Sequence, residues 1–197
     1  AGTAWIDTPE TLTATTSFWS AFQLEYLGVE GTAGGDGMVF ALQDIDDTQV
    51  GLDGGNLGYF LIPPVSGDSV AVEFDTWAGG TDPNDNDISI LRDFIIDTHY
   101  ASASPSFDLN DSATGPFWVW VEYSGINQEL RVYADLGATQ PLSSPLITYS
   151  IDLMTELDPN NVHFGFTAAT GGNKNEHRVP TWFLEVCEDA DGDIICD

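Results

Sequence analysis

Short apolar runs separated by Gly, Pro, Asn and Asp recur along the whole chain. In the run 18–26, Phe18, Phe22 and Tyr26 fall on one face, which is the alternation of a strand that buries one side. No long window keeps apolar residues at the spacing of an amphipathic helix. The other runs span residues 37–43, 57–62, 70–75, 88–91, 93–96, 117–123, 129–135, 148–153, 162–168 and 181–186. These short runs predict an all-β sandwich, with a hairpin turning at 124–127 and one helical turn at 152–156.

Acidic residues outnumber basic ones by 32 to 4, which gives a formal net charge of -28. Such a surface repels nucleic acid and anionic membranes, and it suits cation binding or solubility in salty water. With Lys174 as its single lysine, the chain resembles proteins of marine or salt-tolerant bacteria. It has no apolar run of about 18 residues that would insert into a membrane. It also lacks a signal peptide at its start, so we expect Ala1 to open a cleaved or excised domain.

Acids gather where the run 70–75 ends. Glu73 and Asp75 alternate with apolar residues, the turn-forming segment 78–80 follows, and Asp82 and Asp87 precede the next run. A loop with acids at both ends, held by two strands, offers the oxygen ligands that a hard cation prefers. The alternative is a solvated surface loop, because acids are common throughout this chain.

The last residues form a second acidic segment. Asp189, Asp191 and Asp193 are spaced by two around a glycine, the pattern of a calcium loop that points alternate carboxylates inward. Asp197 comes too early for the bidentate position of a full EF-hand loop. The segment resembles one incomplete thrombospondin type 3 calcium repeat.

Two cysteines, Cys187 and Cys196, lie close together in this segment. In a secreted protein they would pair as a disulfide, and two free thiols are the alternative. We expect the disulfide, because the rest of the chain has an extracellular character. The expected organisation is a sandwich domain over 1–186 and a cysteine-flanked acidic tail over 187–197, the fragment of a longer repeat.

Five motifs resemble those of legume-type (L-type) lectins, and they follow the family's order along the chain. They are Gly34–Phe40, Gly54–Phe60, Val70–Trp77 with its acidic loop, the hairpin Val119–Val132, and Val162–Gly171 with His177 and Trp182–Phe183. The resemblance covers roughly residues 4–187. It implies a jelly-roll β-sandwich of the concanavalin A-like type. It also implies two neighbouring metal ions that order the sugar-binding loops, one being calcium and the other a transition metal in plant members.

The resemblance places metal ligands at Glu73, Asp75, Asp82 and Asp87, together with the backbone carbonyl of Trp77. The family has a histidine at the position of Asp87, and that histidine selects the transition metal. A carboxylate there makes the expected site all oxygen, which favours calcium over manganese or zinc. We therefore expect Ca²⁺ at one or two sites, with a transition metal disfavoured.

Carbohydrate binding is the function that the resemblance implies. Asp36 matches the carboxylate that accepts hydrogen bonds from sugar hydroxyls and that follows a cis peptide in the family. The expected carbohydrate-binding residues are Asp36, Gly55, Trp77, Gly79, Gly172 and Asn173. Gly79 departs from the family pattern, because the family has there an asparagine that binds both calcium and sugar.

Other conspicuous residues have simpler interpretations. The tryptophans Trp5, Trp19, Trp118 and Trp120 are expected to be packing or surface residues rather than a second binding platform. His177 is expected to be a hydrogen-bonded structural residue, and the remaining histidines are scattered. Nothing in the sequence indicates a serine or cysteine nucleophile with an oriented histidine.

The predicted function is a calcium-dependent carbohydrate-binding domain of a secreted or cell-surface protein such as a bacterial adhesin. Its partner would be a glycan or polysaccharide, and the domain would belong to a larger multidomain chain. One alternative is a glycoside hydrolase with a Glu-x-Asp-x-Glu strand, in which Glu73 and Asp75 supply two acids but Trp77 replaces the third. The other is a calcium-stiffened structural module without a sugar ligand.

Overall fold

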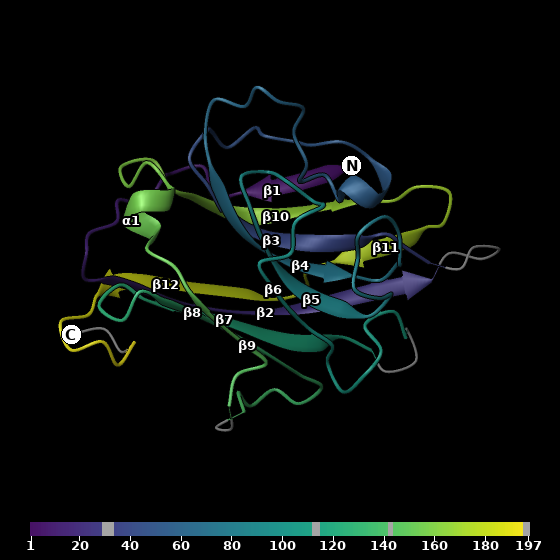
Figure 1. The fold of residues 1–197 in the computed structure, drawn as a ribbon. Helices are drawn as coiled ribbons and strands as arrows, with labels where there is room; N and C mark the ends of the chain where they lie inside the picture. The colour runs from purple at the N-terminus through teal and green to yellow at the C-terminus, as the bar shows by residue number, and fades with distance from the viewer. Residues whose placement is uncertain (29–33, 112–114, 142–143, 195–197) are drawn as a thin grey trace.

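The computed structural model describes residues 1–28, 34–111, 115–141 and 144–194. Within these ranges the chain forms two antiparallel sheets that stack face to face, the upper and lower groups of arrows in Figure 1. The first sheet has the order β1 (Gly2–Trp5), β10 (His163–Ala169), β3 (Gly37–Gln43), β4 (Ser69–Asp75), β5 (Asp87–Arg92) and β6 (Ala101–Ala103). In the second, β11 (Asn175–Arg178) and β12 (Trp182–Glu188) both pair with β2 (Thr16–Gly28), followed by β7 (Phe117–Ser124), β8 (Glu129–Asp135) and β9 (Ile147–Ser150). The predicted all-β sandwich and the β7–β8 hairpin are confirmed.

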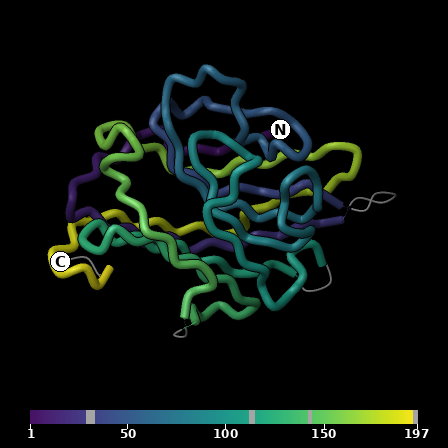
Figure 2. The backbone as a smooth tube through the Cα atoms, in the orientation of Figure 1, coloured from purple at the N-terminus to yellow at the C-terminus, as the bar shows by residue number. Residues whose placement is uncertain are grey.

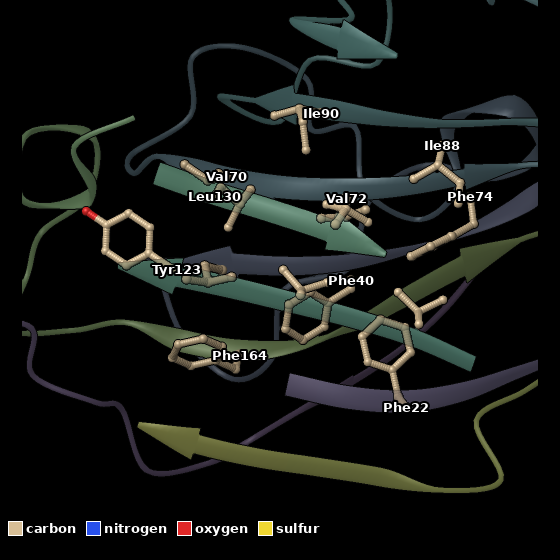
Figure 3. Packing of buried hydrophobic residues seen from close by; sticks show 14 of the residues in the cluster. Phe22, Phe40, Val70, Val72, Phe74, Ile88, Ile90, Tyr123, Leu130 and Phe164 are labelled. Atoms are coloured by element: carbon tan, nitrogen blue, oxygen red, sulfur yellow. The ribbon is translucent and has the colours of Figure 1, made fainter. Parts of the chain in front are cut away.

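Alternation along the strands builds the core between the sheets. Phe22 of β2 meets Phe40 of β3, with ring centroids 5.2 Å apart, and Phe74 of β4, edge-on at 5.9 Å. Figure 3 shows these rings with Val72 and Ile88 in the space that the two sheets enclose. Full burial of each such side chain contributes about 1.5–3 kcal/mol, so this layer holds the sheets together.

The outer face of the first sheet is buried too. Val39, Ala41 and Ala71 point away from the central core and pack under Leu57 and Tyr59 of the segment between β3 and β4. This second apolar layer explains why β3 and β4 are buried along their whole length. It also shields the polar residues at the ends of these strands from solvent.

Two predicted strands are wrong, and both lie in segments that cover the outer face of the first sheet. Residues 57–62 follow a short 3-10 helix (Gly54–Asn56), and Leu57 has a left-handed φ of 56°. Residues 93–96 turn sharply, since Asp93 and Phe94 have φ of 58° and 56°. An apolar run that covers a sheet face has the same composition as a run within a sheet, so the pattern does not separate them.

Three strands were not predicted: β1, β6 and β11. Each is short and consists mostly of polar or small residues, and the sequence of β11 is Asn-Glu-His-Arg. None of them therefore has the apolar alternation that predicts a strand. The predicted run 148–153 divides, because β9 ends at Ser150 and a helical turn follows. That turn, α1 (Leu153–Glu156), starts where the Asp152 side chain accepts a hydrogen bond from the Met154 amide, which confirms the predicted turn.

The expected boundary between residues 186 and 187 falls inside β12, which pairs with β2 as far as Glu188. Figure 2 places the C-terminal segment at one end of the sandwich and the yellow-green turn between β10 and β11 at the opposite end. Among the described residues, no helix has the length and apolar character needed to cross a membrane.

Candidate metal and ligand site

The acidic loop connects two paired strands. In the β4–β5 register, Asp75 lies opposite Asp87 and Glu73 lies opposite Ser89. Because side chains alternate, these residues share the outer face of the first sheet with Ala71. Glu73, Asp75 and Asp87 are all buried there, with Glu73 only 1 % exposed.

Each of three acids is held in place through one of its own two carboxylate oxygens. Asp75 Oδ1 accepts from the Trp77 amide at 3.0 Å and Asp82 Oδ2 from the Gly79 amide at 2.8 Å. Asp87 Oδ2 accepts from the Ser89 hydroxyl at 2.6 Å. These contacts fix the side chains and leave the second oxygen of each for another partner.

Two of these remaining oxygens, Asp75 Oδ2 and Asp87 Oδ1, are buried and have no hydrogen bond among the described residues. A buried carboxylate oxygen without a partner is strongly unfavourable. A divalent cation satisfies several of them at once, and carboxylates plus a backbone carbonyl are ligands that Ca²⁺ accepts. The donor set therefore fits the metal centre that the sequence predicts at these residues.

Burial shifts the titration of this cluster. Desolvation raises the pKa of Glu73 to about 7, against the opposing influence of a neighbouring histidine. Desolvation, reinforced by the charges of Glu73 and Asp82, raises the pKa of Asp75 to about 9. Metal binding at neutral pH therefore has to displace protons from the cluster.

The neighbouring histidine is His99, which the sequence interpretation left among the scattered histidines. Its Nε2 lies 3.1 Å from Glu73 Oε2 and 3.8 Å from Asp82 Oδ1, and its side chain is only 8 % exposed. The structure thus places an imidazole next to the predicted acids, and the all-oxygen ligand set stays a prediction. The only sequence signal was a histidine shortly after Asp97 in the segment that leads away from β5.

A cavity of about 360 Å³ opens over this cluster. Asp75 and Asp82 line it together with Trp77, Gly79 and Gly55. Trp77 is 40 % exposed, so part of this aromatic side chain is accessible from the cavity. The Gly79 position is roomy, since a Cβ there would meet only Asp82 Oδ2 at 3.6 Å and Trp77 Cδ1 at 3.9 Å.

Asp36 is fixed next to this cavity by its backbone. Its amide donates to the Ala169 carbonyl at 3.2 Å, and its carbonyl accepts from the amide and hydroxyl of Thr76 at 3.0 and 2.8 Å. The Gly35–Asp36 peptide is cis, as the resemblance implies. The Asp36 side chain is 8 % exposed, its Oδ2 has no hydrogen-bond partner among the described residues, and burial raises its pKa.

Glycines bring the other loops against Asp36. The Gly54 amide donates to the Thr170 carbonyl at 3.3 Å, which ties the 3-10 turn to the loop after β10. A Cβ on Gly171 would lie 3.2 Å from Asp36 Oδ2 and 3.5 Å from the Gly54 Cα, so this close approach depends on glycine.

The remaining predicted ligand-site residues lie at the rim. A Cβ on Gly35 would sit 3.5 Å from Trp77 Cβ and 3.7 Å from Asn173 Cβ, which places Asn173 beside the aromatic ring. Gly55 lines the cavity, and a Cβ on Gly172 would have nothing within 4 Å. The structure thus places Gly55, Trp77 and Gly79 on the lining of the cavity. Asp36 and Asn173 lie close to these residues through Gly35 and Gly54, and Gly172 is exposed.

The packing interpretation of the tryptophans is confirmed. Trp120 is buried with Ala21 and Tyr133, and it stacks on Trp118 with centroids 6.0 Å apart. His177 differs from the prediction, because its buried Nε2 has no hydrogen bond among the described residues. It packs edge-on against Tyr26 instead, and burial lowers its pKa to about 4.

The acidic tail is partly built into the sandwich. Oxygens of Asp189, Asp191 and Asp193 lie within 4.8 Å of one another, which the acids of the β4–β5 loop do not achieve. Asp189 is fully buried, and it accepts hydrogen bonds from the Ser17 hydroxyl and from two backbone amides, those of residues 192 and 194. Calcium binding by this tail stays a prediction.

The predicted disulfide is only partly visible. Cys187 is disulfide-bonded, and it lies in β12 opposite Ser17. Its predicted partner Cys196 and the terminal Asp197 lie outside the described residues. The pairing with Cys196 therefore stays a prediction.

Comparisons with known proteins agree with this geometry. The sequence model of the family described as the legume lectin domain matches residues 4–194. The probable L-type lectin-domain containing receptor kinase S.7 of Arabidopsis thaliana is 30 % identical over 187 residues, which are 89 % of this chain and 27 % of that protein. Agglutinin-2 of Cladrastis kentukea is 30 % identical over 154 residues, 75 % of this chain and 51 % of its own length. The chain thus spans about half or less of these curated relatives.

Solved structures give the same picture. The crystal structure of basic winged bean lectin with Tn-antigen has a TM-score of 0.75 and 25 % identity, covering 92 % of this chain and 78 % of that one. The metal-free form of lectin I-B4 from Griffonia simplicifolia also has a TM-score of 0.75 and 25 % identity, covering 93 % and 79 %.

Proposed function

This chain belongs to the legume lectin domain family, and we propose that it is a calcium-dependent carbohydrate-binding domain. The observation that carries the proposal is the position of Asp36. Its buried carboxylate oxygen Oδ2 has no hydrogen-bond partner among the described residues and lies against Gly54 and Gly171. The preceding residue, Gly35, approaches Trp77, which lines the cavity over the acidic cluster.

The chemistry of the opening suits a sugar. A pyranose offers hydroxyl groups at its edges and C–H groups on its faces, so it needs a carboxylate, amide donors and an aromatic surface. Asp36 supplies the carboxylate, Trp77 the surface, and the glycine-rich turn at Gly55 approachable backbone amides. Such contacts on a preformed site favour specificity at modest affinity.

Calcium is the resident ion that we propose. Glu73, Asp75, Asp82 and Asp87 would hold it, with the Trp77 carbonyl as a further oxygen ligand. The unpartnered oxygens of this cluster support the assignment. When bound, the ion supplies positive charge that keeps the loop acids and Trp77 in one arrangement.

We also infer an extracellular setting, secreted or on a cell surface, within a larger chain such as a bacterial adhesin. The disulfide-bonded Cys187 supports an oxidising compartment. The relatives support the multidomain setting, since the receptor kinase S.7 is much longer than the part that this chain matches. The acidic composition suits a bacterium of salty water.

The two alternatives carry less support. Catalysis of the retaining type needs two positioned carboxyl groups about 5 Å apart, and Trp77 occupies the position of the third acid of the hydrolase motif. Membership in a lectin family also favours binding over hydrolysis. A purely structural module does not account for the exposed Trp77 beside the unpartnered Asp36 oxygen.

The test is a glycan array with the wild-type domain and Asp36→Asn, each in calcium and in chelator. We expect binding by the wild type in calcium only, and at least about a tenfold loss in the variant, because an amide replaces a charged acceptor of two hydroxyl bonds. Asp47→Asn, at an exposed site elsewhere on the surface, should bind like the wild type. Absence of any bound glycan in calcium, with the fold intact by circular dichroism, would refute the lectin function.

A further inference from the structure

We propose that Asn175 is a positioning residue of the ligand site, and that it acts through a buried hydrogen bond to Asn110. The proposal rests on the carbohydrate-binding function proposed above and adds to it a pair of asparagines that fix the loop carrying Asp36. Neither asparagine lines the cavity over the acidic cluster, so the pair acts on the site from behind this loop.

The connection from β10 to β11 begins and ends on the loop that carries Asp36. At its start the Asp36 amide donates to the Ala169 carbonyl at 3.2 Å, and at its end the Asn175 amide donates to the Gly35 carbonyl at 3.1 Å. A Cβ on Gly35 would lie 3.5 Å from Trp77 Cβ, so a shift of Gly35 would change how Asp36 lies relative to Trp77. The place of Asp36 in the site therefore depends on where Asn175 is held.

The Asn175 side chain packs against the same loop. The residue is 6 % exposed, and its Nδ2 donates to Asn110 Oδ1 at 2.6 Å. A Cβ on Gly34 would come within 2.6 Å of Asn110 Nδ2 and 2.8 Å of Asn175 Oδ1, so both amide groups lie directly against Gly34. The pair thus closes on the backbone immediately before Gly35, where a glycine with a φ of 83° leaves room for it.

Asn110 gives the pair a fixed base. The preceding residue, Leu109, is buried in the core, and its amide donates to Asn86 Oδ1 at 2.8 Å. The Asn110 amide itself donates to Asp108 Oδ1 at 2.8 Å. The backbone of Asn110 is therefore held by the core and by the β4–β5 loop, and its side chain fixes Asn175 relative to both.

Ordinary packing at the start of β11 is the competing interpretation. Any residue except proline could donate the backbone hydrogen bond to Gly35, so that bond does not require an asparagine. The Asn175 side chain buries an amide whose Oδ1 has no hydrogen-bond partner among the described residues, and such burial is unfavourable. A small apolar side chain would avoid this cost. The bond to Asn110 therefore accounts for the asparagine better than packing does.

The experiment is a double-mutant cycle with Asn175→Ala, Asn110→Ala and the double variant. Titration calorimetry in saturating Ca²⁺ measures their affinity for the strongest-binding glycan of the array. We expect each single variant to lose about fivefold or more in affinity, and the double variant to lose little more than one single variant, because both changes remove the same bond. Asn110→Asp keeps an acceptor for Asn175 Nδ2 and should stay within about twofold of the wild type.

A second measurement separates positioning from general stability. Hydrogen exchange of the Asp36 amide, followed by NMR in the ligand-free protein, should become at least about fivefold faster in Asn175→Ala and in Asn110→Ala. Asn161→Ala is the matched control, because it removes a partly buried asparagine whose Nδ2 donates to the Asp44 carbonyl at 2.7 Å before β10 begins. It should lower the melting temperature and leave both glycan affinity and Asp36 exchange unchanged.

Wild-type glycan affinity in Asn175→Ala, with unchanged exchange at Asp36, would overturn the proposal. An equal loss of glycan affinity in Asn161→Ala would overturn it too, because the effect would then follow stability alone. If the wild type binds no glycan, the lectin function fails and exchange at Asp36 decides the positioning role: faster exchange in the variants supports it, and unchanged exchange refutes it. If Asn175→Ala does not fold, Asn110→Ala, at a less buried position, provides both measurements.

Discussion

Gly79 shows how one missing side chain alters a binding site. Its amide already donates to Asp82, so the backbone still serves the acidic cluster. The side chain that the family uses there is absent, and the cavity extends past Gly79 to Asp75 and Asp82. We expect this position to decide how closely a bound ion is linked to a bound sugar.

Gly79→Asn should strengthen glycan binding by about tenfold, because the amide regains hydrogen bonds to sugar and metal in a position with room for it. Titration calorimetry with the best glycan from the array measures the change. Gly2→Asn is the control, since its added Cβ would have nothing within 4 Å and Gly2 does not line this cavity. Weaker binding by Gly79→Asn would mean that the ligand itself occupies this space.

At the scale of elements, β12 and the residues after it act as one unit. The strand continues through Cys187 to Glu188, and the Asp189 amide then donates to the Thr15 carbonyl at 3.0 Å. The buried Asp189 carboxylate gathers the Ser17 hydroxyl and the tail amides. The beginning of the tail therefore closes the end of the sandwich.

Asp189→Ala should lower the stability of the calcium-free domain by roughly 1–3 kcal/mol, because one buried and two partly buried donors lose their acceptor. Chemical denaturation measures this loss. Asp193→Ala, at an exposed member of the same group, should leave calcium-free stability within about 0.5 kcal/mol. If the tail binds calcium, Asp193→Ala will reduce the stabilisation that added Ca²⁺ produces. Equal calcium-free stability of both variants would contradict the closing role of Asp189.

At the scale of the whole molecule, the large negative net charge is the property that most affects stability. A net charge of -28 repels itself over the surface, and salt screens this repulsion. Glu73, Asp75 and Asp87 of the proposed metal site are buried, so salt screens them much less. Folding takes up protons at Glu73 and Asp75, since burial raises their pKa to about 7 and about 9.

The stability of the chelated protein should therefore fall as the pH rises from about 4.5, the ordinary pKa of Glu73, through about 7 and on toward 9. The raised pKa of His99 acts in the same direction, because its stabilisation is lost as that ring deprotonates. The shift of Glu73 alone corresponds to on the order of 3 kcal/mol. Melting curves between pH 5 and pH 8 measure the slope.

Two controls separate the causes of this slope. In high salt, the fall in stability with rising pH should persist in the wild type and should be smaller in Glu73→Gln. Saturating Ca²⁺ should reduce this fall in the wild type. A slope that vanishes in high salt would assign it to surface repulsion instead of the buried acids.

The sequence by itself determined the strands whose patterns are local. Alternation in β2 and β4 predicts both their existence and their buried faces, because side-chain direction in a strand follows directly from position. The resemblance of the motifs to those of the lectin family predicted Glu73, Asp75 and Asp36 as site residues, and the alternation in β4 places Glu73 and Asp75 on one face.

Only the tertiary structure decided the rest. Residues 57–62 and 93–96 are apolar because they cover the outer face of the first sheet. No local pattern distinguishes such a covering segment from a strand. His99 reaches Glu73 through a turn and a return across β5, so its role depends on where distant segments meet. The family's histidine is missing at position 87 in the sequence, yet an imidazole lies in the cluster, because a metal site is defined by positions in space and not along the chain.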